Sequence, residues 1–404
     1  MTPSVPPQTP ATGMTGTVLS GFFLLGMLLA FLGAVMPSWG YHLSSDYLEV
    51  GNYYLSLVGG ILLSAPVGQR FLSTRRVRLP LVLTAVLAAG SLFYLGAVGP
   101  PWPASWRMAG LGACGFSAGI LHSGLFTAIS PLYRRDPAAT VNLSGLLFGL
   151  GALTTALFVA TTFYVYKTSA ILFFLGVIPA LLAGQFSRMQ LPEGDDWPLT
   201  REIDADLQSP AVYLFSFLLF FQFGNEWAIA GWLPLFLVQR LGISPSRSLM
   251  LLALFWFALI LGRFVVLAIL PKVSHGRLLL ASVTAAMLGC IILTFTNNMF
   301  GASVALAFTG CGFAAIYPIV VEKIGSRFRS YHPGHFNGLF SFAVTGGLLA
   351  SASLGYFAHW LGIQVIMGLP FLGSIAVFVL VILIWLETKL HEPDNFPPSS
   401  NMLQ

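Results

Sequence analysis

One carboxylate in this 404-residue sequence lies in unusually apolar surroundings. Nearly every residue between Pro210 and Gln239 is apolar, yet the stretch FQFGNEWAIAGW at 221–232 places Glu226 near the middle of the run. If the run is a helix, Glu226 lies about 16 residues, or roughly 24 Å, from its start. An acid at that depth can bind a polar solute, exchange a proton, or do both. Alternatively, it only bonds to a neighbouring helix and holds the fold together.

Helical geometry indicates which residues share the face of Glu226. At about 100° per residue, and taking Gln222 as zero, Glu226 lies at about 40°. Asn225 and Trp232 lie at about 300° and 280°, so all four fall within one arc of about 120°. Trp227, at about 140°, is expected on the opposite side, toward lipid or another helix. The sequence therefore predicts one substrate-binding stripe of Gln222, Asn225, Glu226 and Trp232.

His122 is a second titratable residue deep in an apolar run, about 12 residues or roughly 18 Å from the basic end of its helix. A pair of His122 and Glu226 across a cavity can move protons near neutral pH, whereas a bond to a backbone carbonyl is the alternative. Asn142, near a helix start, either caps that helix or lines the cavity. Asn337 and Tyr317 complete the predicted substrate-binding set, in which Glu226 and His122 are also the proton-coupling residues.

The elements that must position these residues are membrane helices. The sequence is 56% hydrophobic and 8% charged, whereas soluble domains carry about 25% charged residues. The first apolar run lacks the features of a signal peptide, and the alternating segments of a membrane barrel are absent. Runs of about 20 apolar residues predict twelve helices, at 17–38, 48–71, 79–98, 104–132, 138–165, 168–187, 210–239, 247–270, 277–296, 299–322, 335–360 and 362–387.

Basic residues predict the orientation of these helices. An even number of helices puts both termini on one side, and that side receives 14 of the 19 Lys and Arg residues. Four fall on the other side and Arg263 falls within a span. Because Lys and Arg are enriched in cytoplasmic loops, we expect a multi-pass protein of the cell membrane with both termini cytoplasmic. The net charge of +5 is then a topology signal and not a nucleic-acid patch.

The chain also repeats itself. Three matches recur at offsets of 197, 195 and 194 residues, a register that chance would not keep. They pair CGFSA at 114–118 with CGFAA at 311–315, Asn142 with Asn337, and Gly68 with Gly262. This pattern predicts an all-α membrane protein with twelve transmembrane helices in two pseudo-symmetric six-helix bundles, with substrate near the midplane between them. The predicted parts are a disordered tail at 1–16, bundles at 17–187 and 210–387, an acidic cytoplasmic linker at 188–209 and a tail at 388–404.

A second group of residues is predicted to control opening. Arg263 lies nine residues before Lys272, in the cytoplasmic half of its helix. There it can pair with carbonyls or with Glu322 when the cytoplasmic side closes, or its side chain can simply reach out to the interface. The predicted gating set is Gly68, Arg70, Arg75, Arg76, Gly262, Arg263 and Glu322.

The sequence motifs that usually indicate an enzyme do not support catalysis in this chain. GFSAG at 115–119 has the spacing of a nucleophile elbow, but that motif requires a strand-to-helix turn. Here it lies in an apolar helix, where glycines four apart favour close helix packing. Zinc-protease, Walker and dinucleotide motifs do not occur, and Cys114, Cys290 and Cys311 lack metal-ligand spacing. The sequence therefore predicts no enzyme, no cofactor and no metal site.

Several segments carry a family resemblance. GQRFLSTRRVR, from Gly68, resembles the signature of the major facilitator superfamily, with Arg75 and Arg76 in place and Leu72 where that signature has an Asp. Three further segments resemble the fucose/glucose–galactose permease group within that superfamily. These are NLSGLLFGLGAL at 142–153, GNEWAIAGWLPLFLV at 224–238 and GCGFAAIYP at 310–318.

This resemblance implies the major facilitator fold and a secondary transporter of sugars, usually coupled to protons or sodium. Proton-coupled fucose permeases carry acids in helices 1 and 4, where this chain has Gly33 and Ala118. His122 stands at a position that is usually Asn. Glu226 is then the one deep acid left to couple transport to an ion.

The preferred interpretation is a secondary transporter that moves a sugar or similar small polar solute by alternating access, coupled to protons through Glu226. Amides and an indole at the midplane suit sugars, which accept paired hydrogen bonds and stack on aromatic faces. The alternative is an exporter of amphiphilic or cationic compounds; a receptor or sensor is a third interpretation, from a different class. The expected partners are a small-molecule substrate, protons or sodium as the coupling ion, and the lipid bilayer. We expect a monomer and no nucleic acid.

Overall fold

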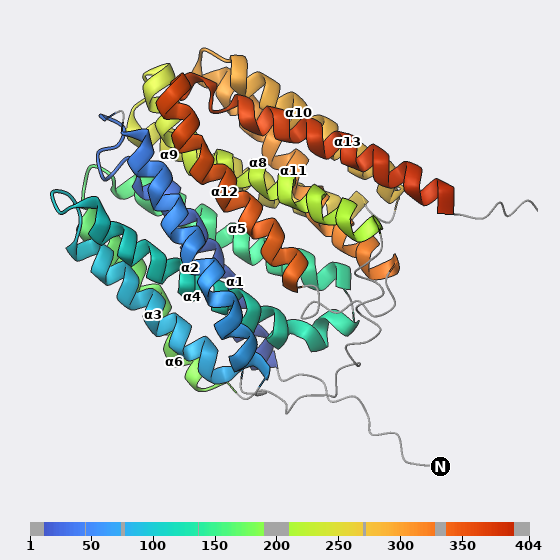
Figure 1. Cartoon of the computed structure of the whole chain (residues 1–404), viewed down its shortest axis with the longest axis horizontal. Helices are drawn as coiled ribbons and strands as arrows, with labels where there is room; N and C mark the ends of the chain where they lie inside the picture. The colour runs from blue at the N-terminus through green and yellow to red at the C-terminus, as the bar shows by residue number, and fades with distance from the viewer. Residues whose placement is uncertain are drawn as a thin grey trace, which may run out of the picture.

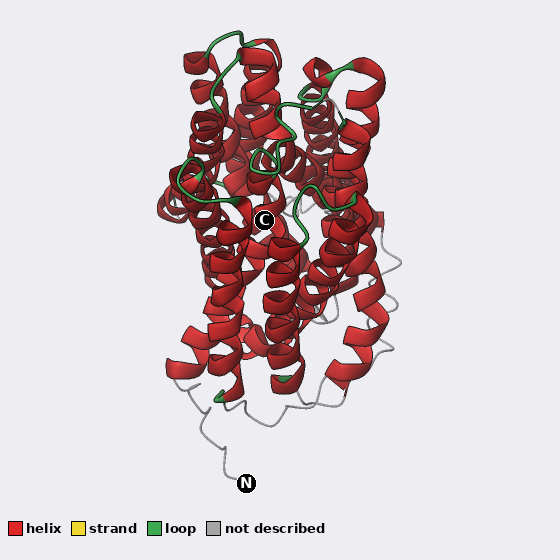
Figure 2. Cartoon of the chain, turned by 90° about the vertical axis from the view of Figure 1, so that its left-hand side faces the viewer, coloured by secondary structure: helices red, strands yellow, loops and turns green. Residues whose placement is uncertain are grey.

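The computed structural model describes residues 12–44, 46–73, 77–135, 137–189, 210–269, 272–327 and 337–391. These residues form twelve α-helices and one short 3-10 helix, with no strand among them (Figures 1 and 2). The helices are α1 (Thr12–Val35), α2 (Tyr47–Ser73), α3 (Arg78–Ala97), α4 (Ala104–Arg135), α5 (Pro137–Thr162), α6 (Thr168–Ser187), α8 (Pro210–Leu241), α9 (Pro245–Ile269), α10 (His275–Phe295), α11 (Met299–Arg327), α12 (Asn337–Leu361), η1 (Ile363–Val365) and α13 (Gly368–His391).

The prediction of an all-α protein with twelve long helices is confirmed, and most helix ends lie within three residues of their predicted positions. Helix α1 begins at Thr12, five residues early and inside the predicted tail. The last helix begins late because Gly362, at φ 85°, ends α12 in a conformation that only glycine adopts freely, and η1 follows it. Residues 1–11, most of the predicted linker and the end of the predicted tail lie outside the described residues.

Eleven of the described helices are long and apolar enough to cross a membrane. In the twelfth, α12, several polar side chains face protein. Ser351 Oγ donates to the backbone oxygen of Trp227 on α8, and the Tyr356 hydroxyl donates to Asn52 Oδ1 on α2 at 2.8 Å. These bonds satisfy polar groups of α12 inside the bundle, where lipid could not.

The helices are arranged as two six-helix bundles, which we call the N half (α1–α6) and the C half (α8–α13) (Figure 1). Helix pairs α2·α4, α3·α6 and α1·α5 pack within the N half, and α10·α11, α8·α12 and α9·α11 pack within the C half. The halves meet where α2 packs on α12 and α5 packs on α9. Helix α9 has the same place in the C half that α2 has in the N half, and α12 corresponds in the same way to α5. The two junctions are therefore equivalent under the predicted pseudo-symmetry.

Hydrogen bonds join the two halves at the end of the molecule where α1 connects to α2 and α8 connects to α9. We call this set of contacts the loop-side seam. Gln239 of α8 reaches the N half, donating from Nε2 to the backbone oxygen of Ser44 at 3.0 Å and accepting a bond from the hydroxyl of Tyr47. Ser246 Oγ donates to the backbone oxygen of Ala160 at 2.9 Å. The loop-side seam therefore ties α8 and α9 to the N half on one face of the membrane.

Candidate functional site

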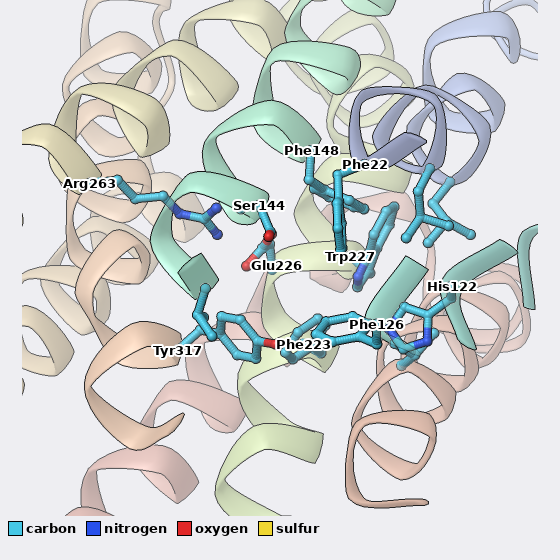
Figure 3. A pocket seen from close by; sticks show the side chains of 15 residues that line it. Phe22, His122, Phe126, Ser144, Phe148, Phe223, Glu226, Trp227, Arg263 and Tyr317 are labelled. Carbon is cyan, nitrogen blue, oxygen red and sulfur yellow. The ribbon is translucent and has the colours of Figure 1, made fainter. Parts of the chain in front are cut away.

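A cavity with about 700 Å³ of empty space, part of it open to solvent, lies between the two halves (Figure 3). Helices α1, α4 and α5 of the N half line it with Phe22, Leu25, Leu29, His122, Phe126, Val141, Ser144, Gly145 and Phe148. Helices α8, α9, α11 and α12 of the C half line it with Phe223, Glu226, Trp227, Arg263, Tyr317 and Val344. Both halves thus contribute to one site, as the repeat predicted.

One face of α8 brings Phe223, Glu226 and Trp227 to the cavity. Their spacing of three and four residues puts them on neighbouring positions of one helical face. Glu226 is 7% exposed and forms no hydrogen bond with any described residue. Its depth was predicted from the sequence, but the direction of Trp227 was not. Trp227 lines the cavity, and its ring meets Phe148 at 5.9 Å and Trp256 at 6.2 Å between centroids.

The other three members of the predicted α8 stripe do not line this cavity in this structure, and substrate binding by them stays a prediction. Trp232 is fully buried, where its Nε1 donates to the backbone oxygen of Ser351 at 2.8 Å and its ring stacks on Tyr54. Asn225 faces α13, because a Cβ added at Gly373 would overlap the amide oxygen of Asn225. Gln222 is 1% exposed, with no hydrogen-bond partner in the part of the chain that the structure describes.

Arg263 brings a guanidinium to the same cavity from α9. Its terminal nitrogen Nη1 lies where a Cβ of residue 145 would stand, so glycine at that position of α5 lets the guanidinium take this position. Figure 3 shows the guanidinium pointing toward Ser144 and Glu226. Nε and Nη1 of Arg263 have no hydrogen-bond partner among the described residues. A buried, incompletely paired charge is unfavourable, so this end of the cavity is suited to receive hydroxyl or anionic oxygens.

Aromatic rings separate this polar end from the opposite end of the cavity. His122 and Phe126 of α4 lie on the far side from Arg263 (Figure 3), with ring centroids 4.8 Å apart. Phe22 meets Phe126 edge to face at 5.4 Å. Tyr317, predicted to bind substrate, lines the cavity with its ring against Phe223 at 5.5 Å. The cavity therefore has a charged end, an aromatic middle and a largely apolar far end.

The two predicted asparagines do not reach this lining. Asn142 is 2% exposed, and neither of its amide atoms has a hydrogen-bond partner within the described ranges. The side chain of Asn337 lies outside what the structure describes. In the described part of the chain, no three His, Cys, Asp or Glu side chains come close enough to hold a metal ion.

The predicted gating residues take different positions. Glu322 pairs with His275 at 3.0 Å and not with Arg263 in this conformation. A Cβ at Gly262 would collide with Ala314 and Cys311, so this glycine permits close packing of α9 on α11 inside the C half. Gly68 is buried on α2, whereas the side chain of Arg70 and all of Arg75 and Arg76 lie outside the described residues. Control of opening by these residues remains a prediction.

Sequence reasoning missed a second carboxylate–arginine pair, at the loop side of the N half. Glu49 of α2 accepts a bond from Arg107 Nη2 of α4 at 2.9 Å and bonds from the hydroxyls of Tyr41 and Tyr53. Arg107 also donates from Nε to the Tyr53 hydroxyl at 2.6 Å and from Nη1 to the backbone oxygen of Trp102 at 2.6 Å. Burial, and then the bond to Glu49, raise the pKa of Tyr41 to about 12, so its hydroxyl remains a donor at neutral pH.

Known proteins resemble this chain along most of its length. The sequence model of the Major Facilitator Superfamily matches residues 18–352 and 215–401. The glucose/mannose transporter GlcP of Bacillus subtilis (strain 168) is 22% identical over 407 residues, covering 96% of this chain and 98% of that protein. An uncharacterized MFS-type transporter of Yersinia pestis is 25% identical over 159 residues, covering 39% of this chain and 41% of that protein.

Solved structures show the same fold. The fucose:proton symporter FucP of E. coli superposes with a TM-score of 0.65 at 14% identity, covering 91% of this chain and 98% of that chain. The nucleoside transporter NupG gives a TM-score of 0.65 at 13% identity, covering 94% and 99%. At such identities the likeness concerns the fold alone.

Proposed function

Because the chain belongs to the Major Facilitator Superfamily, and is therefore a transporter and not an enzyme, we propose that it carries a sugar or similar small polar solute by alternating access. The observation that carries this proposal is the charged end of the cavity. Glu226 of the C half and Ser144 of the N half face one space, with Arg263 beside them. A ligand bound there touches both halves at once, as substrate must if its passage depends on the halves moving relative to each other.

A sugar ring suits this end by its chemistry. Its hydroxyls donate to the carboxylate of Glu226 and accept from the guanidinium of Arg263, and bonds to charged groups are the stronger ones. The indole of Trp227 supplies an apolar face for the C–H side of the ring. The relative GlcP, named as a glucose/mannose transporter, makes glucose and mannose the first substrates to try.

The test is uptake of radiolabelled glucose, mannose and fucose by proteoliposomes containing the purified protein. Imposing a pH gradient, a sodium gradient or neither separates coupled transport from facilitated diffusion. We expect saturable uptake of at least one sugar, with accumulation only under the pH gradient. No saturable uptake of any sugar would contradict the proposal.

Proton coupling is assigned to Glu226, with His122 as a second proton-exchanging group at the opposite end of the cavity. Glu226 makes no hydrogen bond to a described residue and faces the cavity, so a proton can reach it through the same opening as the substrate. A neutralised Glu226 leaves Arg263 without its nearby counter-charge and free to bind substrate oxygens. Substrate and proton would then load together.

Export of amphiphilic or cationic compounds is the second candidate, favoured by the six aromatic residues of the cavity wall. Arg263 opposes its cationic version, because a guanidinium beside Glu226 offsets the attraction of that carboxylate for a cation. Efflux of a fluorescent cationic dye from the same proteoliposomes tests this candidate directly.

The orientation proposed from the basic residues puts both termini in the cytoplasm of a cell-membrane protein that acts as a monomer. A single cysteine introduced at position 200, in a variant lacking Cys114, Cys290 and Cys311, should react with an impermeant maleimide only after the cells are opened. Labelling of intact cells would reverse the topology.

A further inference from the structure

A second cavity, with about 470 Å³ of empty space, adjoins the first between α1, α2, α4 and α12. Leu25, Leu29, His122 and Val344 border both cavities and form a wall that the two share. We call this second cavity the side chamber. It lies at the far end of the main cavity from Arg263, because His122 marks that end in Figure 3.

The side chamber is mainly aliphatic. Ile61, Leu62 and Ala65 of α2 form one wall, and the hydroxyl of Ser64 is turned to its own helix, donating to the backbone oxygen of Ile61 at 2.6 Å. Leu62 is 50% exposed, so the chamber is not sealed. Ser123 and Thr345 also line the chamber, and both have interactions of their own, so the aliphatic wall is the part suited to a hydrocarbon.

The two cavities together form an amphipathic site. Arg263 and Glu226 stand at one end, and Phe22, Phe126 and the side chamber stand at the other. With the anomeric carbon toward the side chamber, the anomeric hydroxyl of a free hexose would be buried against apolar groups without a partner, which weakens binding. A glycoside carries an apolar group at that position and keeps its other ring hydroxyls at the charged end.

Resting on the proposed sugar transport, we infer that the preferred substrate is a glycoside with an apolar aglycone. The sugar ring binds at Glu226 and Arg263, and the aglycone extends past His122 into the side chamber. Each methylene group moved from water into the chamber should tighten binding by up to about fourfold. This gain should stop at the chain length that fills the chamber.

The experiment measures binding of n-alkyl β-D-glucosides and mannosides, from methyl to hexyl, to the protein in lipid nanodiscs. The n-alkanols of the same lengths serve as controls for partition into the lipid. We expect affinity to rise with chain length for the glycosides and no saturable binding of the alkanols.

A variant inside the chamber and a matched variant outside it locate the effect. Ala65→Leu fills the side chamber, whereas Ala180→Leu adds the same atoms on the exposed face of α6. Ala65→Leu should leave the methyl glycosides within about twofold of the parent and abolish the chain-length gain. Ala180→Leu should change neither.

The outcomes separate this inference from the proposed function. If methyl glycosides bind but affinity does not rise with chain length, sugar recognition stands and the aglycone site is wrong. The aglycone site is also wrong if Ala65→Leu keeps the full gain in affinity with chain length. If Ala65→Leu changes only the lipid that copurifies, the chamber is a site for bilayer acyl chains and the aglycone site is again wrong. If no glycoside and no free sugar binds, the proposed function fails together with the inference.

Discussion

Among the described residues, two pairs of a carboxylate and an arginine differ in how completely they are bonded. Glu49 and Arg107 lie 2.9 Å apart, and two tyrosine hydroxyls and a backbone oxygen take up their remaining bonds. Glu226 and Arg263 face one cavity, yet Glu226 has no hydrogen bond to a described residue and two nitrogens of Arg263 have none either. We call the first the bonded pair and the second the open pair.

We infer from this difference a structural role for the bonded pair and a functional role for the open pair. The bonded pair joins α2, α4 and the segment between α1 and α2 within one half. An open pair keeps bonding capacity that its own protein does not use, which is unfavourable in the free protein and useful when a ligand arrives. Variants of the two pairs should therefore damage different properties.

The largest effect is expected for Glu226→Gln, which keeps the shape of the side chain but removes its titration. The variant should bind and exchange substrate, fail to accumulate it under a pH gradient, and lose the pH dependence of binding. Its melting temperature should stay near that of the parent, since no hydrogen bond to a described residue is lost. Uptake and thermal unfolding of the same preparation measure both properties.

Two other results are informative for Glu226→Gln. A fall in affinity equivalent to about 1.5–3 kcal/mol would make the carboxylate a direct ligand. Normal accumulation by a well-folded variant would defeat both functional roles.

Arg107→Ala should have the opposite profile. It leaves Glu49 half-buried without its counter-charge, and breaking such a pair costs about 3 kcal/mol of unfolding free energy. Thermal unfolding in detergent should show a clear drop, while substrate affinity of the folded fraction remains unchanged. Arg247→Ala, an exposed arginine, should change stability by no more than about 0.5 kcal/mol. Reduced affinity without loss of stability would contradict the structural role.

Arg263→Ala should weaken substrate binding by roughly 10- to 150-fold, the range for losing a bond to a charged group. A double-mutant cycle with Glu226→Gln measures how strongly the two residues act together. We expect the two single effects not to add. A change in exchange rate with unaltered affinity would instead support the gating role predicted from the sequence.

The smallest effect is expected at the loop-side seam. Gln239→Ala removes neutral hydrogen bonds to Tyr47 and Ser44, each contributing about 1 kcal/mol. The loop side should then open more often, raising the exchange rate several-fold without changing the pH dependence of binding. A changed pH dependence of substrate binding would mean that the loop-side seam and the Glu226–Arg263 pair do not act independently.

The sequence predicted the helices well because each apolar run is bounded by charges, Gly or Pro, and lipid imposes one minimum length on all of them. It predicted the depth of Glu226 for the same reason. It failed on Trp227 because the helical wheel was oriented by the amides Gln222 and Asn225, which in the structure are buried and do not line the cavity. A helical wheel gives the angle between residues but not which neighbour each residue meets.

The Glu49–Arg107 pair was missed for a related reason. Both residues lie near helix ends, where charges are ordinarily solvated, and they are 58 positions apart in the chain. The four-residue spacing of Glu49 and Tyr53 puts them on one face of α2, and that was the available signal. The sequence does not indicate that α4 is the helix that packs against this face of α2.

The glycine beneath Arg263 has a mechanical consequence. Nη1 of Arg263 occupies the place of a missing Cβ at Gly145, so a side chain of the C half rests on bare backbone of the N half. We expect separation of α5 and α9 to remove this support, which would leave the guanidinium free to change its bonds in the cavity. Movement of the two halves and rearrangement of charge in the cavity would then occur together, linked by the absence of a Cβ at Gly145.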